Sequence, residues 1–384
     1  MNELKEPVYV TRPLLPDVND LYLEIMEIIE SKWITNHGQK HNLLEKKLEN
    51  VLKVPNVSIF NNGSIALLTA LKALDLPMSS EVITTPFTFA ATPHCISWNG
   101  LKPVFCDIEP DTMTINAEKI EELISPNTSA ILPVHVYGFP CDVERIEEIA
   151  QKYDLKVIYD AAHAFSTEIN GKSIGNFGDI TMFSFHATKL YNTLEGGCLT
   201  YINNELKEKI YNLRNFGIKN EEEVVDIGIN GKMNEFQASV GLLNLKLFKK
   251  EQKKRLKIKK LYIEQLNDIE NIRVPQMPKN TTDSCQYFPI VIENNFPINR
   301  DRLYDKLRKC NILTRKYFYP ICSDYEPYHD LESSSVDNLP LANDLKHKVL
   351  CLPYFGSLDS EIVIQICDII RSFSRVPLKI LADH

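Results

Sequence analysis

Short apolar runs alternate with amphipathic stretches through the first 160 residues of the chain. The apolar runs predict buried strands at 57–60, 81–84, 103–106, 129–134 and 156–159. Apolar residues at helical spacing predict helices at 17–32, 42–51, 64–74, 90–99, 117–124 and 143–153. Short strands that alternate with helices form βαβ units, so we expect a mostly parallel sheet with helices on both faces.

The pattern changes after residue 160. Strand-like segments at 178–185 and 197–201 are so close together in the chain that one of them is expected to run antiparallel. Further elements are predicted to be a helix at 205–214, a long helix at 234–266, a strand at 286–292 and helices at 300–309 and 359–373. This order predicts a large α/β domain with an N-terminal arm, residues 1–250, and a smaller α+β domain, residues 251–384.

Composition and charge exclude several classes of protein. The 384 residues are 44% hydrophobic and carry a formal net charge of −8, which argues against a nucleic-acid binder because neutralising phosphates needs a basic face. The lysine-rich stretch 246–260 is therefore interpreted as a solvated helix face. The N-terminus has no apolar signal segment, and no run is long enough to span a bilayer. We expect a soluble cytoplasmic protein that binds neither nucleic acid nor a membrane.

The nine cysteines are scattered along the chain without a CxxC pair. This pattern is typical of reduced thiols in the cytosol rather than of disulfides or a zinc site. His94 and Cys95 have no partners at metal-ligand spacing. We therefore expect no metal site.

Two charged residues stand in positions that suggest chemistry. Asp160 follows the strand at 156–159, and ligands of open α/β sheets bind beyond the carboxyl ends of strands. Its carboxylate is expected either to cap the following segment or to pair with a protonated pyridine nitrogen and keep a pyridoxal ring electron-withdrawing. Lys189 stands between a strand and a Gly-Gly pair in a region of low charge. A partly desolvated amine loses its proton readily and can form a Schiff base, whereas most lysines are solvated surface charges.

A third feature is Asn61-Asn-Gly-Ser64, between a predicted strand and a predicted helix. A Gly-Ser pair that enters a helix exposes backbone N–H groups at the positive end of the helix dipole, which suits a phosphate. The alternative is an ordinary helix cap. The segment matches neither the P-loop nor the dinucleotide-binding glycine pattern, which disfavours ATP and NAD.

Taken together, these residues resemble a known family. From residue 33 to about residue 353 the chain is similar to the DegT/DnrJ/EryC1/StrS pyridoxal-phosphate sugar aminotransferases, which have the aspartate-aminotransferase fold type I. The family's motifs have ordered counterparts in residues 81–92 and 103–107 and in Asn62-Gly-Ser-Ile-Ala-Leu67, Pro133-Val-His-Val-Tyr-Gly138, Asp160-Ala-Ala-His163, Phe183-Ser-Phe-His-Ala-Thr-Lys189 and Glu195-Gly-Gly197.

The resemblance implies roles around the ring of a pyridoxal 5′-phosphate cofactor. Lys189 corresponds to the Schiff-base lysine, which also moves the proton of the reaction. Asp160 corresponds to the acid that pairs with the pyridine nitrogen, and Phe89 to the aromatic residue that stacks on the ring. His163 stands where the family has glutamine or histidine near the 3-hydroxyl.

The resemblance also implies a phosphate site shared between two subunits. Ser184 and the amides of Gly63 and Ser64 correspond to the groups that hold the phosphate. Asn230 corresponds to an asparagine that reaches the phosphate from the other subunit, so a homodimer with shared active sites is expected. The family often has Asn-Tyr-Arg where this chain has Asn230-Gly-Lys232, and lysine lacks the bidentate fork of arginine.

The expected reaction moves an amino group from L-glutamate to a nucleotide-linked keto-6-deoxy sugar. The acceptor is expected to be dTDP-4-keto-6-deoxyglucose, with amination of a 3-keto sugar as the alternative. Family members that dehydrate sugars carry histidine at the lysine position, so Lys189 argues against that chemistry. A non-catalytic binding or regulatory relative is the remaining alternative.

Overall fold

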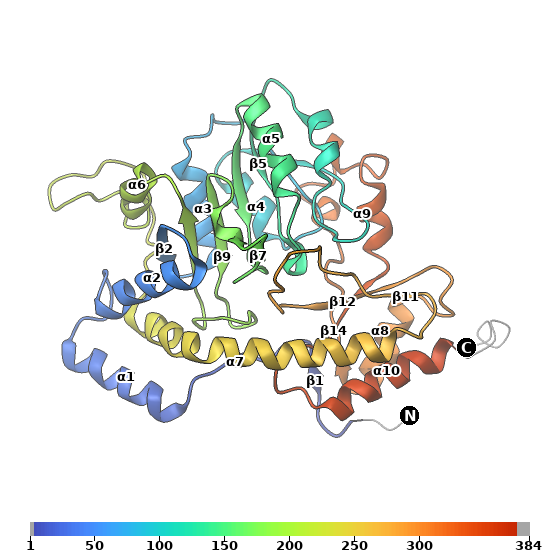
Figure 1. Cartoon of the computed structure of the whole chain (residues 1–384). Helices are drawn as coiled ribbons and strands as arrows, with labels where there is room; N and C mark the ends of the chain where they lie inside the picture. Colours follow the sequence, from blue (N-terminus) through green and yellow to red (C-terminus); the bar gives the residue numbers. More distant parts are fainter. Residues whose placement is uncertain (1–3, 375–384) are drawn as a thin grey trace.

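The computed structural model describes residues 4–374 and centres on a seven-stranded sheet of order β2-β10-β9-β6-β5-β3-β4 (Figure 1). Neighbouring strands from β9 to β4 are parallel, whereas β10 runs antiparallel to both β9 and β2. The mostly parallel sheet and the antiparallel strand are thus confirmed. The strands are β2 (Asn56–Phe60), β3 (Glu81–Thr84), β4 (Lys102–Phe105), β5 (Thr128–Leu132), β6 (Lys156–Asp160), β9 (Ile180–Ser184) and β10 (Gly197–Tyr201).

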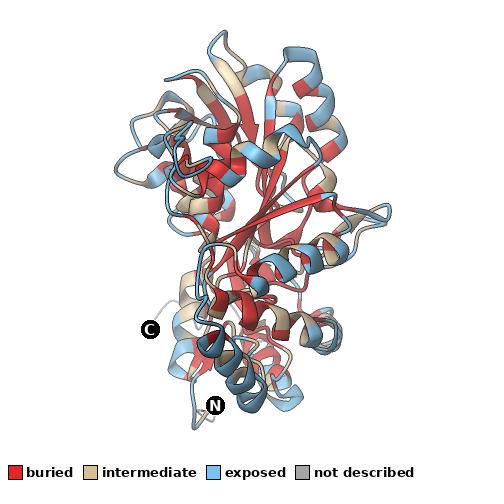
Figure 2. Cartoon of the chain, turned by 90° about the vertical axis from the view of Figure 1, so that its left-hand side faces the viewer, coloured by how far each residue is buried: buried red, intermediate tan, exposed pale blue. Residues whose placement is uncertain are grey.

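Both faces of this sheet are buried. On β6, Val157 and Tyr159 pack into one core while Ile158 packs into another, because successive side chains of a strand point to opposite faces. Figure 2 shows these strands buried between helices whose outer sides are exposed. Two-sided burial explains why the strands appear in the sequence as continuous apolar runs. The covering helices are α2 (Gln39–Leu52), α3 (Gly63–Ala73), α4 (Ala91–Trp98), α5 (Val143–Tyr153) and α6 (Glu205–Leu213).

The longest helix, α7 (Glu235–Leu266), runs across the predicted domain boundary at residue 250. Its start is fixed by a reciprocal pair of hydrogen bonds, in which Asn234 accepts from the N–H of Gln237 (2.9 Å) and Gln237 accepts from the N–H of Asn234 (3.3 Å). Helix α1 (Val18–Ser31) packs on α7. The division into two domains at residue 250 stays a prediction.

Beyond α7 the chain builds a separate core. It includes side chains of a three-stranded antiparallel sheet and of two helices, and Val8 of the N-terminal strand also joins it. The elements here are β1 (Val8–Tyr9), β11 (Ile272–Arg273), β12 (Phe288–Ile292), α8 (Arg300–Lys309), β13 (Ile312–Leu313), α9 (Pro340–Leu345), β14 (Val349–Leu352) and α10 (Ser360–Ser374). Strand β1 pairs in parallel with β13, which brings the start of the chain to its C-terminal part.

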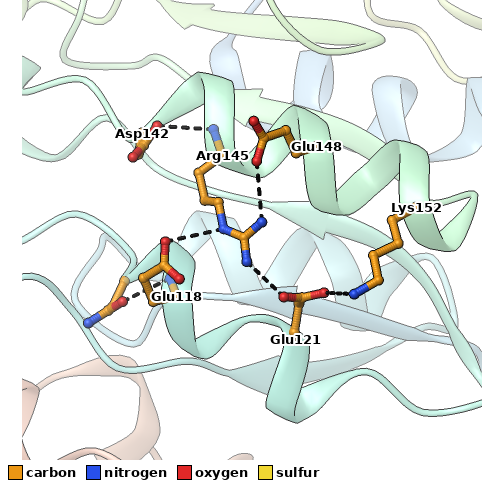
Figure 3. Close-up of polar contacts among 7 residues, drawn as sticks. Glu118, Glu121, Asp142, Arg145, Glu148 and Lys152 are labelled. Atoms are coloured by element: carbon orange, nitrogen blue, oxygen red, sulfur yellow. Dashed lines mark hydrogen bonds and ion pairs between the residues drawn. The ribbon is translucent and has the colours of Figure 1, made fainter.

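The prediction of one regular helix at 117–124 is wrong. Two short 3₁₀ turns, η1 (Ala117–Lys119) and η2 (Glu121–Leu123), occupy the segment. Arg145 of α5 pairs with Glu118 (3.2 Å) and Glu121 (2.7 Å), one residue from each turn (Figure 3). Because these contacts come from a distant helix, the local pattern could not reveal them. A short antiparallel hairpin of β7 (Glu168–Ile169) and β8 (Lys172–Ser173) lies between β6 and β9.

Across residues 4–374, no helix is both long and apolar enough to cross a membrane. Within the same range, no group of three or more His, Cys, Asp or Glu side chains is placed to hold a metal ion.

Candidate active site

A cavity of about 380 Å³ lies where β6 and β9 end and α3 begins. Its walls come from the start of α3, the β3–α4 loop, the segments after β5, β6 and β9, and C-terminal residues at 287 and 315–318. The cavity brings together seven of the eight predicted site residues: Gly63, Ser64, Phe89, Asp160, His163, Ser184 and Lys189. This position agrees with the expectation that ligands bind beyond the carboxyl ends of parallel strands.

The start of α3 forms one end of the cavity. The Asn62 side chain accepts a hydrogen bond from the N–H of Ile65 (2.8 Å) and caps the helix. The first N–H groups of a helix have no partner within it, so the amides of Gly63 and Ser64 remain available at this end. A side chain on Gly63 would place its Cβ 3.2 Å from Cβ of Ser184, so glycine lets the serine approach. Amides and a hydroxyl at a helix N-terminus suit a phosphate group.

Lys189 is half-buried in the cavity wall, and its partial removal from water lowers the pKa of its amine to about 8, although Asp160 opposes the shift. The backbone on both sides of Lys189 is fixed by Gln286. The amide side chain of Gln286 donates to the carbonyl of Thr188 (3.0 Å) and accepts from the N–H of Leu190 (2.8 Å). The result is a positioned amine that is partly deprotonated near neutral pH.

Asp160, the last residue of β6, is held by two hydrogen bonds. Its Oδ1 accepts from the N–H of Ala162 (3.0 Å), and its Oδ2 accepts from the hydroxyl of Thr92 (2.8 Å). Burial raises the pKa of the carboxyl group, while these two bonds and Lys189 lower it. A cationic partner, such as a protonated ring nitrogen, stabilises the charged form of a buried carboxyl group of this kind.

His163 is a neutral donor in this site. The backbone N–H of Tyr137 donates to its Nδ1 (3.2 Å), so the ring proton is assigned to Nε2. Burial, with a contribution from the Lys189 charge, holds the pKa of His163 well below its usual value. Its ring lies parallel to that of Phe318, with centroids 6.1 Å apart. A neutral N–H donor suits an acceptor oxygen on a ligand ring.

Phe89 and Asn230 differ sharply in where the structure places them. Phe89 is 63% exposed and lines the cavity, whereas Phe87, two residues earlier, is buried in the core. Asn230 is exposed and does not line the cavity of its own chain. Its backbone carbonyl accepts from the side chain of Asn61 (3.3 Å).

Sequence reasoning missed several residues of the cavity wall: Thr88, His186, Thr188, Glu195, Tyr287, Arg315, Tyr317 and Phe318. Arg315, Tyr317 and Phe318 come from one segment of the C-terminal part of the chain. His186 and Glu195 lie within matched motifs, and this was the signal available for them. Their Nε2 and Oε1 atoms are 3.5 Å apart.

The pKa of Lys189 predicts how fast the cofactor-free protein captures pyridoxal 5′-phosphate at different pH values. Only the deprotonated amine attacks an aldehyde, so the rate is expected to rise about tenfold per pH unit below pH 8 and to level off above it. In Asp160→Asn the midpoint is expected to move to lower pH, because the carboxylate no longer favours the ammonium form. Stopped-flow absorbance measures both profiles. Midpoints near pH 10 in both proteins would contradict the assignment.

The chain is similar to known proteins over nearly its whole length. The profile of the DegT/DnrJ/EryC1/StrS aminotransferase family matches residues 17–371. A dTDP-4-amino-4,6-dideoxy-D-glucose transaminase of Shigella dysenteriae is 45% identical over 96% of this chain and 99% of the relative. A protein of the same name from Escherichia coli is 46% identical over 95% and 98%. Among solved structures, DesI in the presence of its TDP-sugar product superimposes with a TM-score of 0.94, at 30% identity, covering 100% of this chain and 97% of DesI.

Proposed function

This chain belongs to the DegT/DnrJ/EryC1/StrS aminotransferase family, and from that premise we propose that it moves an amino group from L-glutamate to a nucleotide-linked keto-6-deoxy sugar. Its cofactor is pyridoxal 5′-phosphate. The observation that carries the proposal is the single cavity that holds a partly deprotonated lysine, a buried carboxylate and a helix N-terminus. These groups match the cofactor's aldehyde, ring nitrogen and phosphate.

When bound, the cofactor supplies an aldehyde that takes up the amino group and a ring that withdraws electrons from the reacting carbon. The amides of Gly63 and Ser64, with the Ser184 hydroxyl, are proposed to hold the phosphate. With the cofactor bound, Asp160 would keep a positive charge on the ring nitrogen, and His163 would donate its Nε2 proton to the ring oxygen. Phe89 would cover the ring and exclude water from it.

Lys189 is proposed to move the proton in both halves of the reaction. With the cofactor bound, its amine would take the proton from the Cα of the amino donor and hold it for return, and it would act in the reverse sense once the keto sugar has entered. A base whose pKa is close to neutral is suited to accept and release a proton in turn. The hydrogen bonds from Gln286 to the flanking residues hold the amine in place during these transfers.

The preferred acceptor is dTDP-4-keto-6-deoxyglucose, aminated at C4. The support is the 45% and 46% identity, over nearly the whole chain, to two relatives that bear the name of the corresponding C4 transaminase. The test is to supply purified protein with L-glutamate and either the 4-keto or a 3-keto dTDP sugar, and to analyse the products by mass spectrometry and NMR. An amino group at C4 supports the proposal; turnover of the 3-keto sugar alone overturns it.

We further propose that two copies of the chain form a homodimer with shared active sites. The first support is α1, which has one buried residue, Ile28, and exposes Tyr22, Leu23 and Ile29. An apolar face of this kind typically marks an interface. The second support is Asn230, which is exposed away from its own cavity and is thus free to reach that of a partner.

Mixing two inactive variants tests the shared site. Lys189→Ala and Asn230→Asp are each expected to be inactive, the second because its carboxylate would repel the phosphate. If the two residues act in one site from different subunits, a mixed dimer keeps one intact site. Co-expression should then restore about one quarter of the wild-type activity, because half of the dimers are mixed. No recovery, or an active Asn230→Asp protein, contradicts the proposal.

The compartment is proposed from the cysteines. All nine lie within the described residues, and each is buried and unpaired. Unpaired thiols are typical of a reducing compartment, which supports the cytoplasm.

A further inference from the structure

Arg315 enters the cavity from a backbone segment that is fixed on both sides of its Cα. Its N–H donates to the carbonyl of Cys351 (3.1 Å), and its carbonyl accepts from the N–H of Cys351 (2.8 Å). Two residues further on, Tyr317 packs on Tyr287 with ring centroids 5.4 Å apart. The Tyr287 ring centroid is 5.8 Å from Nζ of Lys189. The fixed segment thus places Arg315 in the wall that faces the reactive amine.

The guanidinium of Arg315 has no anionic partner. Within residues 4–374 it makes no hydrogen bond and no ion pair, and the side chain is exposed to the cavity. Its neighbour Lys316 differs, since its Nζ lies 2.5 Å from Asp301 and 4.4 Å from the centre of the Tyr304 ring. A planar guanidinium with five donors suits a carboxylate or phosphate that arrives with a substrate.

The other charges of the cavity show why a substrate anion needs this residue. Asp160 and Glu195 both line the wall and would repel a dicarboxylate. Among the described lining residues, the lysine and arginine side chains are those of Lys189 and Arg315, and Lys189 is engaged in the chemistry. Arg315 is therefore the cation that remains to balance a substrate carboxylate.

The size of the cavity indicates which substrate, the amino donor or the nucleotide-linked sugar, places its anionic group beside Arg315. About 380 Å³ is near the small end of the range for ligand sites, and this volume must also hold the cofactor. A nucleotide diphosphate would extend beyond it, whereas a compact amino acid would keep both of its carboxylates inside. We propose that Arg315 binds a carboxylate of the amino donor and thereby selects an acidic amino acid. The inference rests on the aminotransferase function proposed above.

The test measures the two half-reactions separately in the cofactor-loaded protein, from the change in visible absorbance. Arg315→Gln is expected to raise the half-saturating concentration of L-glutamate roughly 10- to 100-fold, as expected for loss of a hydrogen-bonded charge. The value for the dTDP-amino sugar, measured in reverse, should change by less than about threefold. Arg315→Lys should fall between, since it keeps the charge but loses the fork.

Lys316→Gln is the matched control. It removes a positive charge from the next residue, whose side chain pairs with Asp301 and does not line the cavity. It is expected to leave both half-saturating concentrations unchanged. If Arg315→Gln raises the half-saturating concentration of the amino sugar as much as that of L-glutamate or more, Arg315 binds the diphosphate and the inference is overturned. The inference is also overturned if neither half-saturating concentration changes.

A binding measurement tests the role of Arg315 independently of the proposed aminotransferase function. Calorimetric titration of glutarate, a dicarboxylate without an amino group, needs no turnover. At least about tenfold weaker binding to Arg315→Gln than to wild type or Lys316→Gln supports the inference. Equal binding to all three proteins overturns it. Failure of L-glutamate to change the absorbance of the wild type would instead count against the aminotransferase function.

Discussion

Replacement of Lys189 by alanine is expected to slow amino transfer by a factor of about 10³ or more. The variant loses both the amine that anchors the cofactor and the base that moves the proton. Proton transfer by a positioned side chain alone accelerates a reaction by about 10²- to 10⁴-fold. The rate of product formation from L-glutamate and the keto sugar, followed by chromatography, measures the effect. Pyridoxal 5′-phosphate should still bind through the phosphate cradle at Gly63 and Ser64, with an altered absorbance maximum.

Lys172→Ala is the control for this variant. Lys172 lies on β8, is exposed, and contacts the ring of Phe177 rather than the cavity. Its replacement is expected to leave the rate within about twofold of wild type, as for most surface substitutions. Wild-type activity in a folded Lys189→Ala protein would remove the proposed mechanism.

The second large effect is expected from Asp160→Asn. Removing one partner of a buried charge pair costs about 3–5 kcal/mol, which corresponds to a loss of about 10²- to 10⁴-fold in rate. The asparagine keeps an acceptor for the N–H of Ala162. Because burial raises the pKa of Asp160, the carboxylate is costly in the empty protein, and the neutral variant should melt no lower than wild type at neutral pH.

Asp179→Asn is the matched control. Asp179 accepts from the N–H of Val157 (2.8 Å) at the opposite end of the sheet strands, and the amide oxygen of asparagine can take over that bond. Transfer rate and melting temperature are measured for both variants. Equal rates in Asp160→Asn and Asp179→Asn would show that the Asp160 charge has no part in the reaction.

Much of the fold could be predicted because its signals are local. The apolar runs gave the strands, since a sheet buried on both faces needs apolar side chains in both directions along β6. Asp160 could be placed beyond such a run because parallel strands end at one edge of the sheet. The long helix predicted at 234–266 from its apolar residues is α7, Glu235–Leu266.

The remaining features depend on contacts between distant segments. On α7, Glu251 and Arg255 occupy positions that the pattern assigns to a solvated face, yet both are buried, with Nε and Oε1 3.1 Å apart. Arg255 also donates to the carbonyl of Cys285, and Glu251 accepts from the N–H of Gly356. No periodicity in α7 reveals partners that come from segments thirty or more residues away.

The same limit applied to the site. The motifs supplied Lys189, Asp160 and His163, which stand beside strand ends. Thr92, which donates to the Asp160 carboxylate, lies on α4 at the end of the matched segment 81–92, but the motif did not reveal which distant residue it contacts. Arg315 and Tyr287 reach the cavity from the C-terminal part of the chain, so their place in it depended on how that part packs.

The most direct test of the account is the visible spectrum of the protein loaded with pyridoxal 5′-phosphate, recorded during a titration with L-glutamate. The account predicts a yellow protein that loses its colour and releases one 2-oxoglutarate per subunit, while Lys189→Ala does neither. A wild-type protein whose spectrum does not respond to L-glutamate, or responds identically in Lys189→Ala, would contradict the claim that this cavity performs amino transfer.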